Sequence, residues 1–364
     1  MIAGSATAAA TAAYAARHAG HTGKGHFRIV NGLSLSSIGI GTYLGNPDAA
    51  TDALVAEAVR TMIGGGVNVI DTAINYRHQR GERSAGTGIA AALASGTATR
   101  EELVVCTKGG YLPDPGGAQW FRTTYVGRDG IAESDLAEGC NCLHPAYLAD
   151  QIERSRRNLG LEKIDVYYLH NPEHHATALG TDGFRTRLEI AFGALENAVA
   201  QGVIGHYGLA TWNGLRVPPG TPGHIDLAAA KAAARQAAGG REDHFGFVQM
   251  PCNLGSPEAL IRKTQPIDGS LVPAVAAAQR LGLAVAFSRP VAAGRLPALK
   301  PALAKALGDG FATDVQRALQ FARGVPETAT ALVGAKQPAH VAAALEVAAK
   351  PALPADLYRR LLPA

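Results

Sequence analysis

The stretch VNVIDTA at residues 67–73 decides the fold class of this chain. It is a short apolar run that ends on polar residues, and it follows the amphipathic segment TDALVAEAVRTMI at residues 51–63. The apolar side chains of that segment fall on one helical face, and a glycine run at 64–66 ends the helix. A helix that leads into a short apolar strand is the repeating unit of a parallel sheet.

The same unit recurs along the whole chain. Seven further apolar runs alternate with amphipathic segments: SIGIGTYLG (37–45), ELVVCTKGG (102–110), IDVYYLH (164–170), GHYGLAT (205–211), FGFVQMPCN (245–253), LAVAFSRP (283–290) and TATALVGA (328–335). The chain holds eight such units, and its 364 residues exceed the about 250 residues that a bare (β/α)8 barrel needs. The sequence therefore predicts one α/β TIM barrel with insertions. A doubly wound sheet is the alternative, which is weakened because no G-x-G-x-x-G follows an early strand.

Several segments lie outside the repeat. FRIV, Asn31-Gly32 and LSLS at residues 27–36 predict an N-terminal hairpin that caps the barrel. Residues 111–143 form a long insertion after the third strand, and loops of this length are uncommon unless they are functional or disordered. We expect this insertion to be a lid over the ligand-binding face, with a mobile surface loop as the alternative. A barrel at 27–350 is expected between an N-terminal extension at 1–26 and a C-terminal tail at 351–364.

Composition argues against several classes of protein. The chain is 47% hydrophobic and 18% charged, which allows a large buried core. Its 34 basic and 30 acidic residues are spread without a basic cluster interleaved with aromatics, so we expect no nucleic-acid partner. No apolar run reaches the roughly 18 residues that cross a bilayer, so no membrane partner is expected. Residues 1–26 lack the charged and apolar regions of a signal peptide, and we expect a cytoplasmic protein of unpredicted oligomeric state.

Four cysteines, at positions 106, 140, 142 and 252, are too few and too scattered for a disulfide scaffold. The segment CNCLH at 140–144 could supply three metal ligands, but no fourth residue stands at a spacing that completes a tetrahedral zinc site. We therefore expect no metal and interpret this segment as an ordinary loop.

Polar side chains stand at the ends of successive predicted strands. Asp71, Lys108 and His170 end the second, third and fourth strands, and Tyr76 follows the second. In a barrel, these positions face the ligand. A buried Asp and Lys on neighbouring strands suggest a salt bridge. The lysine charge is expected to lower the pKa of Tyr76 from about 10, which would make the phenol a usable proton donor near neutral pH.

These residues lie in a pattern that resembles the aldo-keto reductase superfamily from residue 27 to about 349. The pattern consists of GVNVIDTAINY (66–76), Glu82, CTK (106–108) and DVYYLHNP (165–172). Asp71 and Tyr76 stand five apart, as in the family, and Glu82 stands six further on. Four later segments resemble the family's cofactor-binding strand ends: GHYGLATW (205–212), VQMPCN (248–253), AFSRP (286–290) and VGAKQPAH (333–340).

The resemblance implies an NAD(P)H-dependent oxidoreductase that moves hydride between nicotinamide and the carbonyl or alcohol carbon of an aldehyde, ketone or sugar. Tyr76 would be the general acid and base, Lys108 and Asp71 would tune its pKa, and His170 would orient the carbonyl. The positions that match contacts of NADPH, with NADH possible, are Thr42, Asp71, Thr211, Gln249, Phe287 (the ring on which nicotinamide stacks), Ser288, Gly334, Lys336 and His340. The expected substrate pocket, for an apolar or sugar-ring face, consists of Tyr43, Tyr111, Trp120, Phe121, Asn171 and Trp212.

The sequence departs from the family pattern in the cofactor region. Ala210-Thr211 stands where the family has a Ser-Asn pair that grips the carboxamide. His340 and Ala344 replace a basic residue and an Asn near the adenosine 2′-phosphate, and Lys336 is the cation that remains. The resemblance therefore implies a shallower preference for NADPH over NADH than is usual in the family.

Two other functions stay open at this point. A Schiff-base aldolase on the same barrel would use Lys108 as its nucleophile, but it needs a deprotonated lysine, which Asp71 opposes. A regulatory barrel that binds the cofactor with little turnover is the second alternative.

Overall fold

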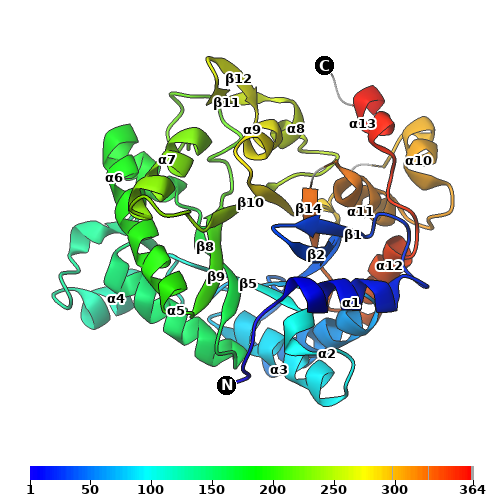
Figure 1. The fold of residues 1–364 in the computed structure, drawn as a ribbon, viewed down its shortest axis with the longest axis horizontal. Coiled ribbons are helices and arrows are strands. Elements are labelled where there is room, and N and C mark those ends of the chain that lie inside the picture. The colour runs from blue at the N-terminus through cyan, green and yellow to red at the C-terminus, as the bar shows by residue number, and fades with distance from the viewer. Residues whose placement is uncertain (297, 327, 362–364) are drawn as a thin grey trace.

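Eight parallel strands close into one barrel in the computed structural model, which describes residues 1–296, 298–326 and 328–361 (Figure 1). β14 pairs with β3, and this pairing closes the ring. The strands are β3 (Ile38–Gly41), β4 (Val69–Asp71), β5 (Val104–Gly109), β8 (Ile164–His170), β9 (Ile204–Ala210), β10 (Phe245–Pro251), β13 (Ala284–Ser288) and β14 (Thr328–Gly334). Each predicted apolar run coincides with one of them, except that β9 begins one residue before its run, and the predicted (β/α)8 barrel is confirmed.

Side chains alternate between the two faces of each strand because successive residues of a strand point to opposite sides. One set fills the barrel interior and includes Val104, Cys106, Tyr168, Phe247 and Ala286. The other set packs against the surrounding helices in a larger outer core. This alternation decides which residues at the strand ends can reach a ligand.

Eight helices surround the barrel, each after one strand. They are α2 (Ala49–Gly64), α3 (Arg80–Ala94), α5 (Pro145–Leu159), α6 (Glu173–Ala200), α7 (Leu227–Ala237), α9 (Ala274–Arg280), α11 (Asp314–Gly324) and α12 (Pro338–Ala348). Polar caps start several of them: the Asp48 side chain accepts from Thr51 N–H at the start of α2, and Thr313 forms a capping box with Gln316 at α11. Within the described ranges, no helix is long and apolar enough to cross a membrane.

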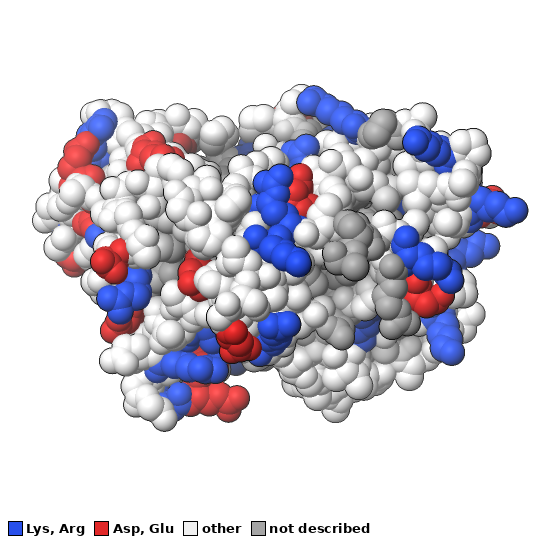
Figure 2. Space-filling view, turned by 90° about the horizontal axis from the view of Figure 1, so that it is seen from above, with Lys and Arg blue, Asp and Glu red and all other residues white. Residues whose placement is uncertain are grey.

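Smaller elements decorate the loops. A short helix, α8 (Glu258–Ile261), and the hairpin β11 (Lys263–Ile267) and β12 (Ser270–Pro273) lie between β10 and α9, and α10 (Pro301–Gly308) precedes α11. At the C-terminal end of the described chain, α13 (Ala355–Leu361) packs against α11, and Tyr358 donates a hydrogen bond to the Phe321 carbonyl at 2.6 Å. On the face drawn in Figure 2, charged side chains of both signs are scattered over a mostly uncharged surface.

The N-terminal region covers one end of the barrel. The predicted hairpin is present as β1 (Phe27–Val30) and β2 (Leu33–Ser36), and both residues of its Asn31-Gly32 turn have positive φ, as this two-residue turn requires. Leu35 of the hairpin belongs to the interior cluster. Helix α1 (Ala8–His18) lies against β2 (Figure 1), and its buried Tyr14 donates a hydrogen bond to the Ile63 carbonyl at 2.5 Å.

The insertion at 111–143 is folded. It forms α4 (Gly117–Tyr125) and the short hairpin β6 (Leu136–Ala137) and β7 (Asn141–Cys142), and its Phe121 packs in a small core that Tyr147 of α5 completes. Tyr125 donates to Asp150 of α5 at 2.5 Å, and Asp135 pairs with Arg187 of α6 at 2.7 Å. The middle of the insertion therefore packs on the outside of α5 and α6, where α4 lies at the edge of the molecule in Figure 1. The prediction of a lid is wrong for this part, because its aromatic residues are buried against the helical layer.

Candidate active site

A cavity of about 1110 Å³ opens at the carboxyl ends of the barrel strands. Strand-end residues line its floor, because the barrel turns them inward: Gly41, Asp71, His170, Ala210, Gln249, Ser288 and Gly334. The cavity extends from His170 across the barrel mouth to Ala339 and His340 at the start of α12.

Asp71 and Lys108 form an ion pair at one side of this floor. The Lys108 Nζ donates to Asp71 Oδ1 at 2.5 Å and to the Thr72 carbonyl at 2.7 Å, and Gln249 donates to Asp71 Oδ2 at 2.8 Å. Burial raises the pKa of Asp71 against the effect of Lys108. Burial also opposes the charge of Lys108, but Asp71 and Tyr76 raise the pKa of this lysine above its ordinary value, so it stays protonated. The predicted salt bridge is present.

Tyr76 stands directly above this pair. The Lys108 Nζ lies 4.9 Å from the centroid of the Tyr76 ring, and the edge of Tyr43 packs against the same ring with centroids 5.0 Å apart. Burial raises the pKa of Tyr76, and Lys108 offsets only part of that effect. The prediction of a lowered pKa is therefore wrong in sign, because removing the phenolate from water costs more than the lysine charge returns.

His170 faces Tyr76 across the cavity, with ring centroids 5.8 Å apart. Burial and the charge of Lys108 lower the pKa of His170, so its imidazole is neutral near pH 7. Its Nδ1 is buried without a hydrogen-bond partner in the described part of the chain. Asn141 of the insertion donates to the His170 carbonyl at 2.8 Å and holds the end of β8. A neutral imidazole here can donate one N–H into the cavity.

The turn that follows Tyr76 has an energetically unfavourable backbone conformation. Arg77, His78 and Gln79 all have left-handed φ values, of 49°, 55° and 69°. Such a run in residues with side chains costs about 1–2 kcal/mol each and persists only where the surroundings hold it.

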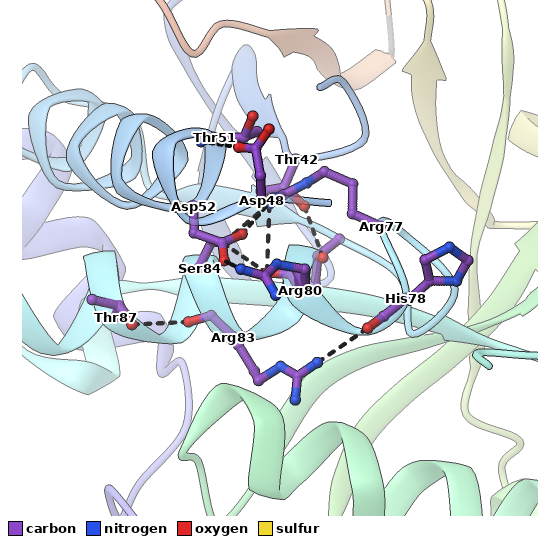
Figure 3. A network of polar contacts seen from close by, with 11 residues as sticks. Thr42, Asp48, Thr51, Asp52, Arg77, His78, Arg80, Arg83, Ser84 and Thr87 are labelled. Atoms are coloured by element: carbon purple, nitrogen blue, oxygen red, sulfur yellow. Dashed lines mark hydrogen bonds and ion pairs between the residues drawn. The ribbon is translucent and has the colours of Figure 1, made fainter. Parts of the chain in front are cut away.

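Asp52 of α2 holds this turn. Arg77 donates to its carboxylate at 2.5 Å, Arg80 pairs with it at 2.6 Å, and Ser84 donates at 3.0 Å. Figure 3 shows these side chains converging on Asp52. The side chain of Arg77 is only 3% exposed. No sequence motif marks this cluster, because its members lie on two helices and a turn.

Five positions predicted to bind the cofactor, besides Asp71, line the cavity: Thr211, Gln249, Ser288, Gly334 and His340. Thr211 Oγ1 is buried without a partner among the described residues. Thr42 lies just beneath the floor and donates to Thr72 at 2.8 Å. Lys336 is half-buried beside Gly45, outside the lining.

Phe287 is misassigned in the sequence analysis. It points to the outer face of β13, where it is fully buried in the core between strands and helices, together with its ladder partners Met250 and Ala331. It does not line the cavity and so cannot stack on a ligand there. The physical reason is strand alternation, because Ser288 faces inward and its neighbour must face outward.

Arg289 is a cavity residue that the sequence analysis did not select. It follows Ser288 in a left-handed backbone conformation with φ of 52°, and its guanidinium lies 5.0 Å from the centroid of the Trp212 ring. The sequence could have identified Arg289 as a cavity residue, because it stands directly after a predicted ligand-binding strand.

Four of the predicted substrate-pocket residues line the cavity: Tyr43, Tyr111, Asn171 and Trp212. Trp120 and Phe121 do not. Phe121 is fully buried in the core of the insertion, and Trp120 packs at its edge against Tyr125 and Arg154. Their assignment to the pocket is wrong, because the insertion uses its aromatics to pack on α5.

The CNCLH segment has structural roles. His144 is the N-cap of α5, where its Nδ1 accepts from Ala146 N–H at 3.3 Å. Cys142 is buried, which raises the pKa of its thiol to about 12. No group of three His, Cys, Asp or Glu side chains within the described ranges is arranged to hold a metal ion.

Comparisons with known proteins agree with this geometry. The family model for the aldo/keto reductase family matches residues 37–217. D-threo-aldose 1-dehydrogenase from Pseudomonas sp. is 30% identical over 182 residues, which are 50% of this chain and 51% of that protein. Prostaglandin F synthase 1 from Bos taurus is 26% identical over 145 residues, 40% of this chain and 34% of that protein. The matches thus span about half or less of these relatives.

Solved structures resemble almost the whole chain. An aldo-keto reductase from Bacillus halodurans in its holo form has a TM-score of 0.60 at 20% identity, covering 94% of this chain and 95% of that one. An aldo/keto reductase from Klebsiella pneumoniae in complex with NADP and acetate has a TM-score of 0.60 at 22% identity, covering 93% and 95%. With the family model, the closed barrel and the ordered sequence motifs in agreement, the chain belongs to the aldo-keto reductase superfamily.

Proposed function

We propose that the protein is an NADPH-dependent oxidoreductase that reduces a carbonyl group of an aldehyde, ketone or sugar, or oxidises the corresponding alcohol. The observation that carries this proposal is the convergence of Tyr76, His170 and the Asp71–Lys108 pair on one cavity. A proton donor, a neutral hydrogen-bond donor and a buried cation are the groups that carbonyl reduction needs around the developing alkoxide.

The raised pKa of Tyr76 keeps its phenol protonated at neutral pH, so it can deliver a proton to the carbonyl oxygen. Lys108 stabilises the phenolate that remains, and Asp71 fixes the lysine through a 2.5 Å hydrogen bond. His170, neutral because of burial, donates a hydrogen bond that orients the carbonyl. In the reverse direction, the phenolate of Tyr76 accepts the proton of the alcohol.

The cavity fits a nicotinamide dinucleotide. Its volume of about 1110 Å³ exceeds the ~300–1,000 Å³ of pockets for drug-sized ligands, which leaves room for a long cofactor and a small substrate. The unpartnered Thr211 hydroxyl and the Gln249 amide would hold the carboxamide, and Ser288 would contact the phosphates. A bound nicotinamide supplies or accepts the hydride in this reaction.

The far end of the cavity suits an anionic group. Ala339 and His340 line it at the start of α12, where the helix dipole is positive, and Lys336 stands just before this helix. This end would receive the 2′-phosphate of NADPH. Because it lacks an arginine fork, we keep the expectation of a modest preference over NADH.

The decisive experiment is a carbonyl and sugar screen with NADPH and NADH, followed by the absorbance of the reduced cofactor. We expect turnover with NADPH, and we expect Tyr76→Phe to abolish it while cofactor binding persists. Turnover in that variant would remove Tyr76 from the mechanism. Absence of turnover with tight cofactor binding would favour the regulatory barrel.

The geometry of Lys108 argues against the aldolase alternative. Lys108 is fully buried, is paired with Asp71, and does not line the cavity. A nucleophilic lysine must be deprotonated and reachable by substrate, and Lys108 is neither. Borohydride should therefore trap no substrate on the protein.

A further inference from the structure

Beside His170, three side chains form a hydrogen-bonded chain that the proposed reaction does not use. The Tyr111 hydroxyl lies 2.5 Å from His174 Nε2, and His174 Nδ1 contacts the Glu138 carboxylate. Asn171 Nδ2 donates to the Tyr111 oxygen at 3.2 Å. All four residues line the cavity.

This chain, which we call the Tyr111–His174–Glu138 chain, stands at the reacting end of the cavity. The rings of Tyr111 and His170 pack edge to face with centroids 4.9 Å apart. A substrate whose carbonyl is held between Tyr76 and His170 would therefore lie beside Tyr111.

Hydrogen bonds from α5 hold the Tyr111 end of the chain. The buried Gln151 of α5 donates to the Tyr111 carbonyl at 2.8 Å and accepts from Gly110 N–H at 2.6 Å. Glu138 sits in the turn between β6 and β7 with φ of 48°, and His174 lies in the first turn of α6. Tyr111 and Glu138 are the residues of the 111–143 insertion that reach the cavity among those described. The insertion thus contributes two of the three members of the chain.

The chemistry of the groups sets the direction of the hydrogen bonds. A carboxylate only accepts, so Glu138 selects the His174 tautomer with its proton on Nδ1, and Nε2 of that tautomer accepts from the Tyr111 hydroxyl. Burial raises the pKa of Tyr111 to about 12, so its hydroxyl keeps its proton. The Tyr111 oxygen, which also accepts from Asn171, therefore offers the cavity an acceptor and no donor.

The charges around the chain favour a neutral substrate. Glu138 and Glu173 both line this end of the cavity. Glu173 Oε1 accepts from the backbone N–H groups of Trp212 and Asn213, and its Oε2 is buried without a partner among the described residues. Arg289, which follows β13, is the arginine that lines the cavity among the described residues, and its guanidinium lies over Trp212, so this end of the cavity holds one arginine beside the two acidic side chains. Burial raises the pKa of Glu173, so Glu138 is the carboxylate that opposes anions here, and the acceptor atoms of both residues suit hydroxyl donors.

We propose that the Tyr111–His174–Glu138 chain is a subsite that accepts a hydrogen bond from a substrate hydroxyl close to the reacting carbonyl. It makes neutral hydroxylated aldehydes and ketones better substrates than unsubstituted or carboxylate-bearing ones. The inference rests on the proposed function for its reaction, but the subsite is defined by its own contacts.

The kinetic test compares three aldehydes with NADPH: D-glyceraldehyde, which carries hydroxyls, propanal, which has none, and succinic semialdehyde, which carries a carboxylate. Tyr111→Phe should lower kcat/KM for glyceraldehyde about 10-fold more than kcat/KM for propanal, the effect of one hydrogen bond to the substrate. Adding Glu138→Gln should cause little further loss, because the chain acts as a unit. Tyr125→Phe is the matched control, since its hydroxyl bonds Asp150 in the insertion core outside the cavity.

Two kinetic outcomes would overturn the inference. Equal losses for glyceraldehyde and propanal in Tyr111→Phe would show that Tyr111 only supports His170. A wild-type enzyme that prefers succinic semialdehyde would show that the carboxylates do not select the substrate.

A binding test separates this inference from the proposed function. Erythritol, a polyol that carries no carbonyl, should quench Trp212 fluorescence in a Trp120→Phe background, which leaves Trp212 as the single tryptophan. Tyr111→Phe should weaken erythritol binding about 10-fold, and it should have a much smaller effect on the binding of 1,2-dimethoxyethane, which has no hydroxyl. If no carbonyl is reduced yet this difference appears, the proposed function fails and the subsite stands. If erythritol binds both proteins equally, the subsite is refuted.

Discussion

We expect the ion pairs around Asp52 to hold Tyr76 in position for catalysis. Asp52 itself is not among the described residues that line the cavity. Burial alone raises the pKa of Asp52, but its hydrogen bonds to Arg77 and Arg80 bring the net pKa below its ordinary value. A carboxyl group whose pKa is depressed in the folded state contributes stability at every pH above its unfolded pKa. That contribution is lost only as the pH falls through the folded pKa. The ion pairs are therefore complete at neutral pH, and Asp52→Asn removes their full contribution.

The structure allows the magnitude to be worked out. The Asp52 side chain is 29% exposed and its partner Arg77 only 3%, so the pair lies between an exposed pair worth about 0–1 kcal/mol and a buried one that costs about 3–5 kcal/mol to break. We take about 2 kcal/mol. The three left-handed residues after Tyr76 cost together about 3–6 kcal/mol. Once the ion pairs are lost, the turn relaxes toward ordinary φ values and carries Tyr76 with it.

We expect Asp52→Asn to lower kcat for carbonyl reduction about 10²-fold, the effect of a displacement of roughly 1 Å at a reacting group, with the dissociation constant of NADPH nearly unchanged. The assays are steady-state kinetics, cofactor fluorescence titration and thermal unfolding. Glu57→Gln is the matched control, because Glu57 lies on the same helix and pairs with Arg60 in an exposed i,i+3 contact. A folded Asp52→Asn protein with wild-type kcat would refute the reasoning, and so would an equal loss in Glu57→Gln.

Three further predictions follow from the site. Tyr76→Phe should lower the rate of carbonyl reduction by a factor of about 10²–10⁴ with NADPH still bound. Because the pKa of Tyr76 is raised, the wild-type rate of reduction should stay constant through neutral pH and fall only in alkali, where the rate of alcohol oxidation rises. A rate of reduction that already falls below pH 8 would contradict the raised pKa. Lys108→Met should lower the free energy of unfolding, measured in urea, by about 3–5 kcal/mol, because it leaves the buried Asp71 unpaired. The double variant Lys108→Met/Asp71→Leu should recover part of that stability. Equal stability of the single variant and the wild type would show that another group stabilises the Asp71 carboxylate. Lys336→Ala should weaken NADPH binding more than NADH binding in a fluorescence titration, and equal effects on both would place the 2′-phosphate elsewhere.

Much of the fold follows from local patterns that the chain carries in its sequence. The eight strands are short apolar runs, most of the helices around the barrel end at a glycine or shortly before one, and Asn31-Gly32 dictates its own turn, so each signal is readable within a few residues. Asp71, Lys108 and His170 could be placed near one another because parallel strands bring their carboxyl ends to one face. These features depend on sequence spacing alone.

The tertiary structure decided what depends on orientation, burial and distant contacts. Phe287 faces the helices because one step along a strand reverses the side-chain direction, and a motif does not show that direction. The pKa of Tyr76 is raised because desolvation outweighs Lys108, a balance that depends on the depth of burial. Tyr111 and His174 meet although they stand 63 positions apart, because the barrel brings the insertion after β5 against the start of α6. Periodicity predicts which elements form, whereas the packing of elements decides which side chains share a cavity and what their surroundings cost.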